Sequence, residues 1–234
     1  MFFLCIYIIK HFDGIFYIYK YFFYFRTQVN TIENNEDIRK VKNISFIDKN
    51  GKKFTRTNDE SSITILDTIA FAARDVAISA IKKNIPIEIG ILAERGCPFS
   101  CSFCNGDRFF SNGKVGLIRR RSPLNVVNEM MSLTPLFKNK ELILHFYDAT
   151  FITRSADSRA WIDEFCSLLE ERNLKIPFDA FIRSDSFDFD RDEELINRLV
   201  NNGLIGTYVG LEAGDDDTLQ LYNKGIKSIP IHYR

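Results

Sequence analysis

The chain has 234 residues and a mass of 27.2 kDa, and its 31 basic side chains balance 31 acidic ones. Apolar residues make up 45% and charged residues 26% of the sequence, which is close to the globular average and excludes a disordered or collagen-like chain. A neutral chain has no bulk electrostatic attraction to nucleic acid. Five cysteines are too few for a disulfide scaffold, and the close spacing of three of them indicates a metal site in a reducing compartment. We therefore expect a cytoplasmic protein.

The first 26 residues hold 12 of the 32 aromatic residues. Lys10, Asp13 and Lys20 interrupt this apolar run, whereas a membrane-spanning helix needs about 20 apolar residues with few charges. A signal peptide would need a basic start and a small-residue cleavage site. Alternation of Phe and Tyr with Ile favours buried strands, and a membrane-associated segment and a non-native leader are the alternatives. We interpret residues 1–40 as the remnant of a larger domain and expect no membrane partner.

Residues 41–86 are predicted to form a hairpin and a connector. Asn50 and Gly51 separate two strand-like runs at residues 44–48 and 53–57. Asn-Gly is the strongest short-range hairpin signal, because a type I′ turn needs positive φ at both central residues. Residues 65–83 are rich in alanine and roughly helical in period.

Residues 87–234 alternate between strand-like and helix-like segments, and this alternation predicts an α/β fold with a parallel sheet. Active groups of such sheets gather at the carboxyl ends of the strands. Ser122 followed by Pro123, and Asp215 before two further acids, are typical helix starts. The predicted strands cover residues 87–93, 141–147, 176–183 and 205–212, and the predicted helices cover residues 123–137, 158–172, 191–202 and 215–223.

Cys97, Cys101 and Cys104 follow the first of these strands in RGCPFSCSFC, with the spacing C-x3-C-x2-C. Structural zinc sites need four protein ligands, and ferredoxin clusters use four cysteines, but no fourth cysteine lies nearby in the sequence. The alternatives are a zinc site completed by the distant His145 and three cysteines that only pack in the core. A cluster with three protein ligands keeps one iron open, and catalysis requires such an open position.

The same segment resembles the cluster loop of the radical S-adenosylmethionine superfamily. The resemblance implies that Cys97, Cys101 and Cys104 bind a [4Fe–4S] cluster whose fourth iron is chelated by the amino and carboxylate groups of S-adenosylmethionine. It also implies that Phe103 lies near the adenine. Residues 116–130, GLIRRRSPLNVVNEM, are similar to the basic entry of the helix that follows this loop. Taken alone, these arginines form a solvated face, with nucleic-acid contact as the alternative.

Further matches place cofactor-binding residues at the ends of the later strands. ELILHFYDATFIT is similar to the segment that contacts the amino group of S-adenosylmethionine, which places Tyr147 and Asp148 there, although Ala149 stands where the family has a second acid. GLEAG after the fourth strand is similar to a turn whose polar residue, here Glu212, lies near the ribose or the methionine. Arg183 matches an arginine of this branch, and it would pair with the cofactor's carboxylate or form a structural ion pair.

The resemblance implies a partial parallel (β/α) barrel behind the small hairpin and helical connector. The family's barrel has six βα units and residues 87–234 supply about four, so we expect an incomplete barrel in a chain truncated at both ends. Residues 41–86 resemble the link to a cobalamin-binding domain in one branch of the superfamily. The cobalamin motif Asp-x-His-x-x-Gly is absent, so we expect no cobalamin here, although the parent lineage used it.

By this resemblance the chain is an enzyme in which one electron from the cluster cleaves S-adenosylmethionine to methionine and a 5′-deoxyadenosyl radical. That radical would attack an unknown substrate, with methyl transfer as a frequent outcome in this branch, and flavodoxin or ferredoxin would supply the electron. One alternative is a methylthiotransferase-like enzyme acting on RNA or protein, which would need a second three-cysteine cluster. The other is an inactive truncated fragment, whose open sheet edge would favour aggregation.

Overall fold

The computed structural model describes residues 17–19, 31, 33–41, 44–47, 54–57, 65–106, 118–138, 141–188 and 191–227. The chain divides into two compact units, residues 1–62 and residues 63–234, and each is described by itself. The predicted boundaries after residues 40 and 86 stay predictions.

The first unit contains a three-stranded antiparallel sheet in the order β1 (Tyr17–Tyr19), β2 (Ile44–Ile47) and β3 (Phe54–Arg56). The pairing of β2 with β3 confirms both strands of the predicted hairpin, whereas its Asn-Gly turn lies outside the described residues. A short 3-10 helix, η2 (Ile38–Lys40), precedes β2. Val41, Ile44 and Phe46 form a small buried cluster. Apart from β1, the aromatic segment at residues 1–26 lies outside the described residues.

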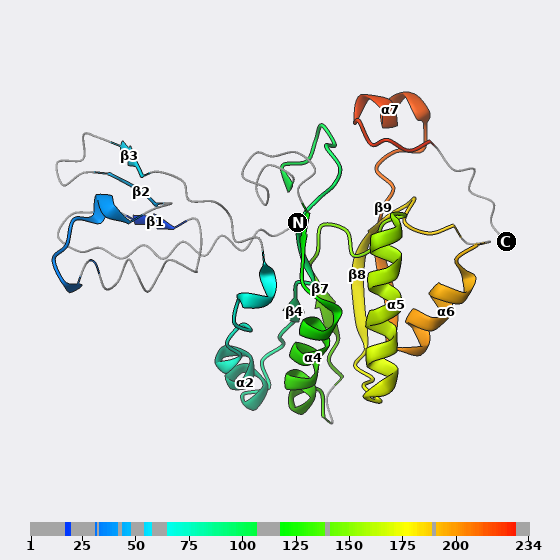
Figure 1. The fold of residues 1–234 in the computed structure, drawn as a ribbon, viewed down its shortest axis with the longest axis horizontal. Coiled ribbons are helices and arrows are strands. Elements are labelled where there is room, and N and C mark those ends of the chain that lie inside the picture. The colour runs from blue at the N-terminus through cyan, green and yellow to red at the C-terminus, as the bar shows by residue number, and fades with distance from the viewer. Residues whose placement is uncertain are drawn as a thin grey trace. The chain divides into compact units, whose positions relative to one another are not determined.

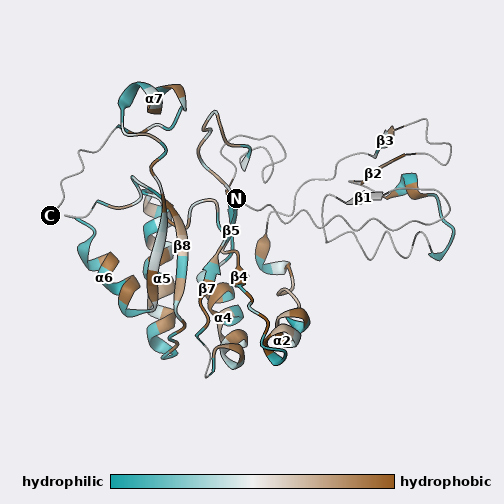
Figure 2. Ribbon diagram, turned by 180° about the vertical axis from the view of Figure 1, so that it is seen from behind, coloured by the Kyte–Doolittle hydropathy of each residue, from teal (hydrophilic) through white to brown (hydrophobic). Residues whose placement is uncertain are grey.

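The second unit is built on a four-stranded parallel sheet in the order β4 (Ile89–Ile91), β7 (Leu144–Phe146), β8 (Phe178–Arg183) and β9 (Leu204–Gly210). The helices α4 (Pro123–Phe137), α5 (Ala156–Glu171) and α6 (Glu193–Asn201) alternate with these strands. In Figure 1, α4 and α5 lie in front of the strands, and in Figure 2, seen from behind, the strands come to the front. These helices therefore cover one face of the sheet. The predicted α/β fold with a parallel sheet is confirmed.

The predicted helix starts are confirmed by their caps. The Ser122 side chain accepts a hydrogen bond from the backbone N–H of Asn125, and Pro123 is the first residue of α4. Asp215 accepts a hydrogen bond from the Thr218 N–H at the start of α7 (Asp216–Leu221). Within the described part of the chain, no helix is both long and apolar enough to cross a bilayer.

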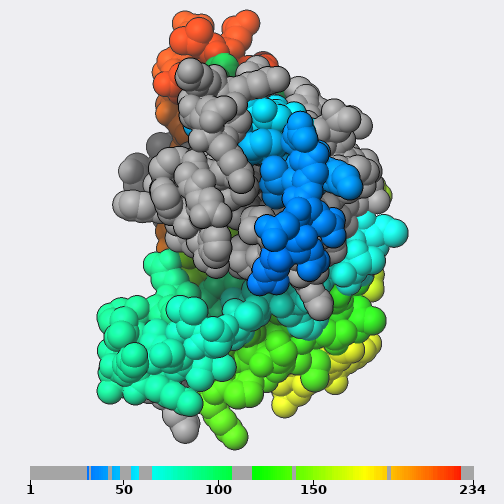
Figure 3. Space-filling model, turned by 90° about the vertical axis from the view of Figure 1, so that its left-hand side faces the viewer, coloured from blue at the N-terminus to red at the C-terminus, as the bar shows by residue number. Residues whose placement is uncertain are grey.

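The helical period at residues 65–83 is confirmed only in part. This segment forms a 3-10 turn, η3 (Leu66–Thr68), and then α2 (Asp75–Lys82), with non-helical residues between them. The break lets Asp67 accept a hydrogen bond from the Ser122 N–H and lets Arg74 bond both the Gly90 carbonyl and Glu129. These contacts between distant segments outweigh the helical propensity of alanine. Figure 3 shows the turquoise residues of this connector lying against the green residues that follow.

The core lies between the sheet and the helices and centres on Phe146 of β7. Its ring centroid is 4.7 Å from that of Phe151, 5.4 Å from that of Phe178 and 6.1 Å from that of Phe165. All four rings are buried, and burial of one such side chain stabilises a fold by about 2 kcal/mol. Strand residues alternate between the two faces of a sheet. His145, which directly precedes Phe146 in β7, therefore lies on the face opposite the helices.

Among the described residues, the strand β9 lies at the edge of the sheet, because it pairs with β8 alone. Its apolar side chains Ile205 and Val209 are exposed, as is Leu211 just after it. A cavity of about 1140 Å³ runs along this strand, with α6 and α7 contributing to its wall. Parallel strands are usually covered on both faces, whereas β9 exposes apolar side chains on both of its faces, Val209 on one and Tyr208 on the other.

Candidate active site at the carboxyl edge of the sheet

The three clustered cysteines lie on a loop that leaves a two-stranded ribbon just beyond β4. This ribbon pairs β5 (Glu94–Gly96) with β6 (Ile118–Arg120) in antiparallel fashion. Gly96 has a φ of 112°, in a region that residues with a side chain rarely adopt, and it turns the chain into Cys97. We call residues 97–106 the cysteine loop; residues 107–117 lie outside the described residues. The loop therefore starts near the carboxyl end of a parallel strand, as predicted.

All three cysteines of this loop are free thiols, with Cys97 and Cys101 half-buried and Cys104 exposed. Burial raises the pKa of Cys97, and the neighbouring Cys101 and Cys104 raise it further. The backbone N–H of Gly106 donates to Cys104 Sγ at 3.3 Å, and Nη1 of Arg183 donates to Cys101 Sγ at 3.8 Å.

The described residues contain no three His, Cys, Asp or Glu side chains arranged to hold a single metal ion. The alternative of a zinc site with His145 lacks such a ligand set, and His145 Nδ1 instead lies 2.7 Å from Asp179 Oδ1. A cubane cluster differs from a single ion, because each cysteine sulfur binds a different iron. Free thiols that receive N–H donors provide the soft ligands and the supporting contacts that such a cluster uses. The residues present therefore fit a cluster.

Asp148, predicted to contact the cofactor's amino group, is only 2% exposed. Its Oδ1 accepts a hydrogen bond from the Glu94 N–H at 2.6 Å. Burial and the nearby Glu94 carboxylate raise the pKa of Asp148 to about 8. Burial also raises the pKa of Glu94 to about 7, although Arg120 Nε donates to it at 2.7 Å. Two buried acids thus lie at the start of the strand that leads into the cysteine loop, where Asp148 joins the end of β7 to β5.

Tyr147 comes directly after β7 and stacks on His145, with the ring centroids 5.8 Å apart, so it lies on the face opposite the helices. Its hydroxyl donates to Glu88 Oε2 at 2.7 Å, near the start of β4 and away from the carboxyl edge. Burial and this carboxylate raise the pKa of Tyr147. The ring covers Gly90, where an added Cβ would come within 2.2 Å of Cε2. The predicted contact of Tyr147 with the cofactor stays a prediction, and its observed contacts lie within the sheet.

Phe103 and Glu212, far apart in the sequence, are brought together by Lys224. Nζ of Lys224 lies 2.9 Å from Glu212 Oε1 and 5.8 Å from the centroid of the Phe103 ring. Lys224 is only 4% exposed, and a buried ammonium requires such a partner. No motif in the sequence singled out Lys224, because a lysine after a short helix has no distinctive pattern.

The residues that follow α7 also hold the cysteine loop. Ser102 donates from its backbone N–H to the Tyr222 carbonyl at 2.9 Å and from its hydroxyl to the Leu221 carbonyl at 3.1 Å. The Asn223 side chain donates to the Ser100 carbonyl at 2.9 Å. Phe103 packs its ring edge-on to Tyr222, with the centroids 5.2 Å apart. Residues 221–224 therefore form a docking segment for the cysteine loop. No motif in the sequence indicated this segment.

Arg183 is 6% exposed and makes protein contacts through all three guanidinium nitrogens. Nε donates to Asp185 Oδ1 at 2.8 Å, Nη2 donates to the Lys224 carbonyl at 2.6 Å, and Nη1 faces Cys101. Of the two roles that the sequence left open, these contacts fit the structural ion pair.

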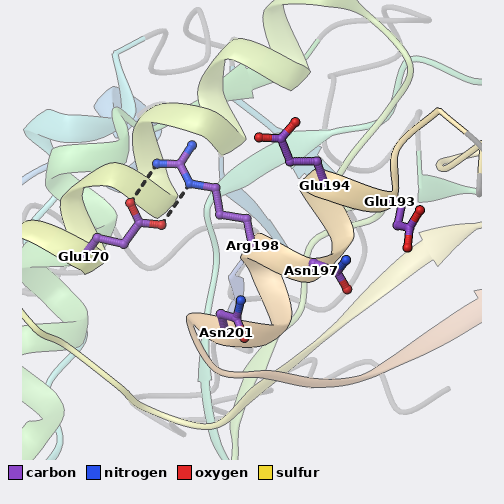
Figure 4. A pocket seen from close by; sticks show the side chains of 6 residues that line it. All are labelled: Glu170, Glu193, Glu194, Asn197, Arg198 and Asn201. Atoms are coloured by element: carbon purple, nitrogen blue, oxygen red, sulfur yellow. Dashed lines mark hydrogen bonds and ion pairs between the residues drawn. The ribbon is translucent and has the colours of Figure 1, made fainter.

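A second hollow, of about 550 Å³, lies on the surface of α5 and α6 (Figure 4). There the Arg198 guanidinium faces both oxygens of Glu170, at 2.8 and 2.9 Å. Hydrogen bonds from Arg198 and Asn202 lower the pKa of Glu170 to about 2. The predicted site residues do not line this hollow, so its ion pair is a contact between two helices.

No protein-family profile matches the chain, but curated relatives and solved structures do. The chain is 29% identical over 194 residues to the anaerobic magnesium-protoporphyrin IX monomethyl ester cyclase of Cereibacter sphaeroides, covering 81% of this chain and 29% of that protein. It is 30% identical over 171 residues to the bacteriochlorophyllide d C-8(2)-methyltransferase of Chlorobaculum tepidum, covering 70% of this chain and 34% of that protein. The chain thus spans about a third of the length of these relatives.

The fold is similar to that of two enzymes solved with their cofactors. The cobalamin-dependent S-adenosylmethionine radical enzyme OxsB, with aqua-cobalamin and S-adenosylmethionine bound, matches with a TM-score of 0.68 and 23% identity over 87% of this chain and 28% of OxsB. The radical S-adenosylmethionine methyltransferase TsrM of Kitasatospora setae, with cobalamin and a [4Fe–4S] cluster bound, matches with a TM-score of 0.59 and 18% identity over 86% of this chain and 39% of TsrM. The chain is thus similar in sequence to this cyclase and this methyltransferase, and its fold is similar to that of the two radical S-adenosylmethionine enzymes.

Proposed function

We propose that this chain forms the catalytic core of a radical S-adenosylmethionine enzyme. Cys97, Cys101 and Cys104 would hold a [4Fe–4S] cluster, and S-adenosylmethionine would bind beside them. When bound, these groups supply reductive cleavage of S-adenosylmethionine and a radical that begins chemistry on the substrate. We also propose that an electron donor such as flavodoxin or ferredoxin reduces the cluster. The parallel sheet would be part of a partial (β/α) barrel.

One observation carries the proposal. Three free thiols lie on one loop that follows a strand of the parallel sheet. The edge of an open parallel sheet at the carboxyl ends of its strands is where such folds place their ligands. The loop is also fixed by contacts from β8 and from residues 221–224, so its thiols are held in place before any cluster binds.

The chain's own residues divide into binding and holding roles. Phe103 exposes half of its side chain beside the loop and offers an apolar face to an adenine ring. Glu212 offers a carboxylate to the ribose hydroxyls or to the methionine amino group, and Lys224 fixes its position. Asp148 holds β5 and the start of the loop, so in this proposal it acts on the geometry of the cysteines.

The test is anaerobic reconstitution with iron and sulfide, followed by EPR of the reduced protein with and without S-adenosylmethionine. We expect a reduced [4Fe–4S] signal that shifts when S-adenosylmethionine is added. Cys101→Ala should remove the signal. Cys166→Ala is the matched control, because Cys166 is a free thiol that lies in the buried core away from the loop. A wild-type protein that binds no cluster, or one whose signal ignores S-adenosylmethionine, would overturn the proposal and favour the inactive alternative.

Methyl transfer is the finer proposal for the reaction. It is supported by the relative named as a bacteriochlorophyllide methyltransferase and by the fold of the methyltransferase TsrM. We assign no substrate and no cobalamin ligand to this chain, whose sequence lacks the Asp-x-His-x-x-Gly motif. Incubation of the reconstituted protein with methyl-labelled S-adenosylmethionine and candidate acceptors tests it, and label that remains only in S-adenosylmethionine or methionine would count against it.

A further inference from the structure

We propose that Arg183 is a positioning residue that acts on the cluster ligand Cys101, in place of the carboxylate-binding role that its position in the sequence suggested. The inference rests on the proposed function, which makes Cys101 a ligand. It concerns a side chain that joins the end of β8, the cysteine loop and the docking segment at residues 221–224.

The guanidinium lies against an aromatic ring of the cysteine loop. Cζ of Arg183 is 3.6 Å from the centroid of the Phe99 ring, which is close for a cation–π contact. Phe99 lies between Cys97 and Cys101 in the sequence. A planar cation stacked on this ring therefore fixes the part of the loop that separates two of the predicted ligands.

The edges of the guanidinium are already occupied by protein acceptors. Nε donates a hydrogen bond to Asp185 at 2.8 Å, and Nη2 donates one to the Lys224 carbonyl at 2.6 Å. Nη1 lies 3.8 Å from Cys101 Sγ. A bidentate bond to a ligand carboxylate needs two parallel N–H groups on one edge. Because each nitrogen has a partner and the residue is 6% exposed, a cofactor carboxylate could bind in this way only by displacing one of them.

The position of the charge has a consequence for the cluster. A permanent cation and an N–H donor beside a ligand sulfur stabilise negative charge on that sulfur. Reduction adds an electron to the cluster, so a nearby positive charge favours the reduced state and makes the reduction potential less negative. Arg183 thus both orients Cys101 and adjusts the potential at which the cluster accepts an electron.

Two substitutions separate these effects. Arg183→Met removes the charge and the donors and keeps an unbranched side chain, whereas Arg183→Lys keeps the charge but loses the planar fork. The matched control is Arg159→Met. Arg159 also pairs with an acid, Asp192, at 2.7 Å and also lies over a ring, Phe187, at 5.5 Å. Its hydrogen bonds within the described part of the chain go to Ser186 and Asp192 and not to the cysteine loop.

The first measurement is hydrogen–deuterium exchange of the protein without cluster. In Arg183→Met and in Arg183→Lys we expect faster exchange in peptides that cover residues 97–106 and 222–227. Arg159→Met should change exchange only near residues 186–192. Exchange in Arg183→Met that equals wild type in both loop peptides would overturn the proposal.

The second measurement is the midpoint potential of the reconstituted cluster. We expect a more negative potential in Arg183→Met and a potential close to wild type in Arg183→Lys and Arg159→Met. A side chain that only supports the fold would leave the potential unchanged once the cluster has formed. Unchanged exchange and potential, combined with weaker S-adenosylmethionine binding, would instead assign Arg183 to the cofactor carboxylate. If wild type forms no cluster, the proposed function fails, while the exchange experiment still tests the contact between Arg183 and the loop.

Discussion

Asp148 accepts a hydrogen bond from the backbone N–H of Glu94 through an oxygen that lies 2.6 Å from the nitrogen. This bond joins the residues that follow β7 to the first residue of the strand that leads into Cys97. Within the described part of the chain, Oδ2 of Asp148 and Oε1 of Glu94 have no hydrogen-bond partner. Two buried carboxyl groups with free oxygens are costly unless protons or cations compensate them, and Arg120 supplies one positive charge to Glu94.

We predict that the free energy of unfolding decreases as the pH rises from about 5 to 8.5. An unfolded aspartate titrates at about 3.9, whereas the folded pKa of Asp148 is about 8. The folded chain therefore retains a proton that the unfolded chain releases, and its stability falls between these two pKa values. Each unit of difference corresponds to about 1.4 kcal/mol. Urea unfolding at pH 5.5 and 8.5 measures the effect.

Asp148→Asn should flatten this pH dependence, because the amide keeps an oxygen for the Glu94 N–H and does not titrate. Asp163→Asn is the control, since Asp163 is an exposed acid on α5. A slope that is as steep in Asp148→Asn as in wild type would mean that other groups cause it.

Gly90→Ala should destabilise the fold by about 1 to 3 kcal/mol, the usual cost of forcing a methyl group into packed space. The added Cβ would come within 2.2 Å of the Tyr147 ring, so the ring must move and its bond to Glu88 must break. Urea unfolding of Gly90→Ala, Tyr147→Ala and the double variant gives the coupling energy. The double variant should cost less than the sum of the single variants, and additive costs would contradict the close approach of the ring.

Asn223→Ala and Asn223→Gly should both speed hydrogen exchange in the cysteine loop, because each removes the side-chain bonds to Ser100. Asn223 has a φ of 49°, so alanine also carries backbone strain of about 1 kcal/mol that glycine avoids. Asn173→Gly is the control, because Asn173 has nearly the same φ of 48° and follows α5. If neither variant at position 223 changes exchange in residues 97–106, residues 221–224 do not hold the loop.

Val209→Lys should reduce self-association of the protein without lowering its stability by more than about 0.5 kcal/mol. Val209 is 44% exposed on the edge strand β9, and apolar edge strands promote pairing with other chains. Light scattering against protein concentration measures the effect. Val76→Lys makes the same chemical change on α2, where Val76 is also exposed, and should have little influence. Equal effects of the two variants would trace the change to net charge alone.

Local signals in the sequence were sufficient for much of the fold. Ser122 and Pro123 located the start of α4, and Asp215 located the start of α7, because a cap depends on neighbouring backbone groups. The alternation of strand-like and helix-like segments predicted the parallel sheet, because the period of each segment also depends on residues close together in the chain. The helical period at residues 65–83 corresponds to an α-helix only at Asp75–Lys82, because Asp67 and Arg74 bond segments more than fifteen residues away.

The candidate site follows the same division. The spacing of Cys97, Cys101 and Cys104 identified the loop and, through its resemblance, the chemistry that we propose. No local sequence motif predicted the contacts of Lys224 and Asn223 with the site, or the contact between Arg183 and Phe99. Each of them joins segments that are at least 80 residues apart or lies in a turn without a motif.

The sequence by itself thus determined the order of elements, the helix caps and the three cysteines, because each depends on residues close together in the chain. Only the tertiary structure decided which side chains reach the cysteine loop. Asp148 turned out to face the buried β5, and Tyr147 the opposite face of the sheet. Those directions depend on the register of parallel strands and on the burial of charges among distant segments, and no local pattern of residues encodes them.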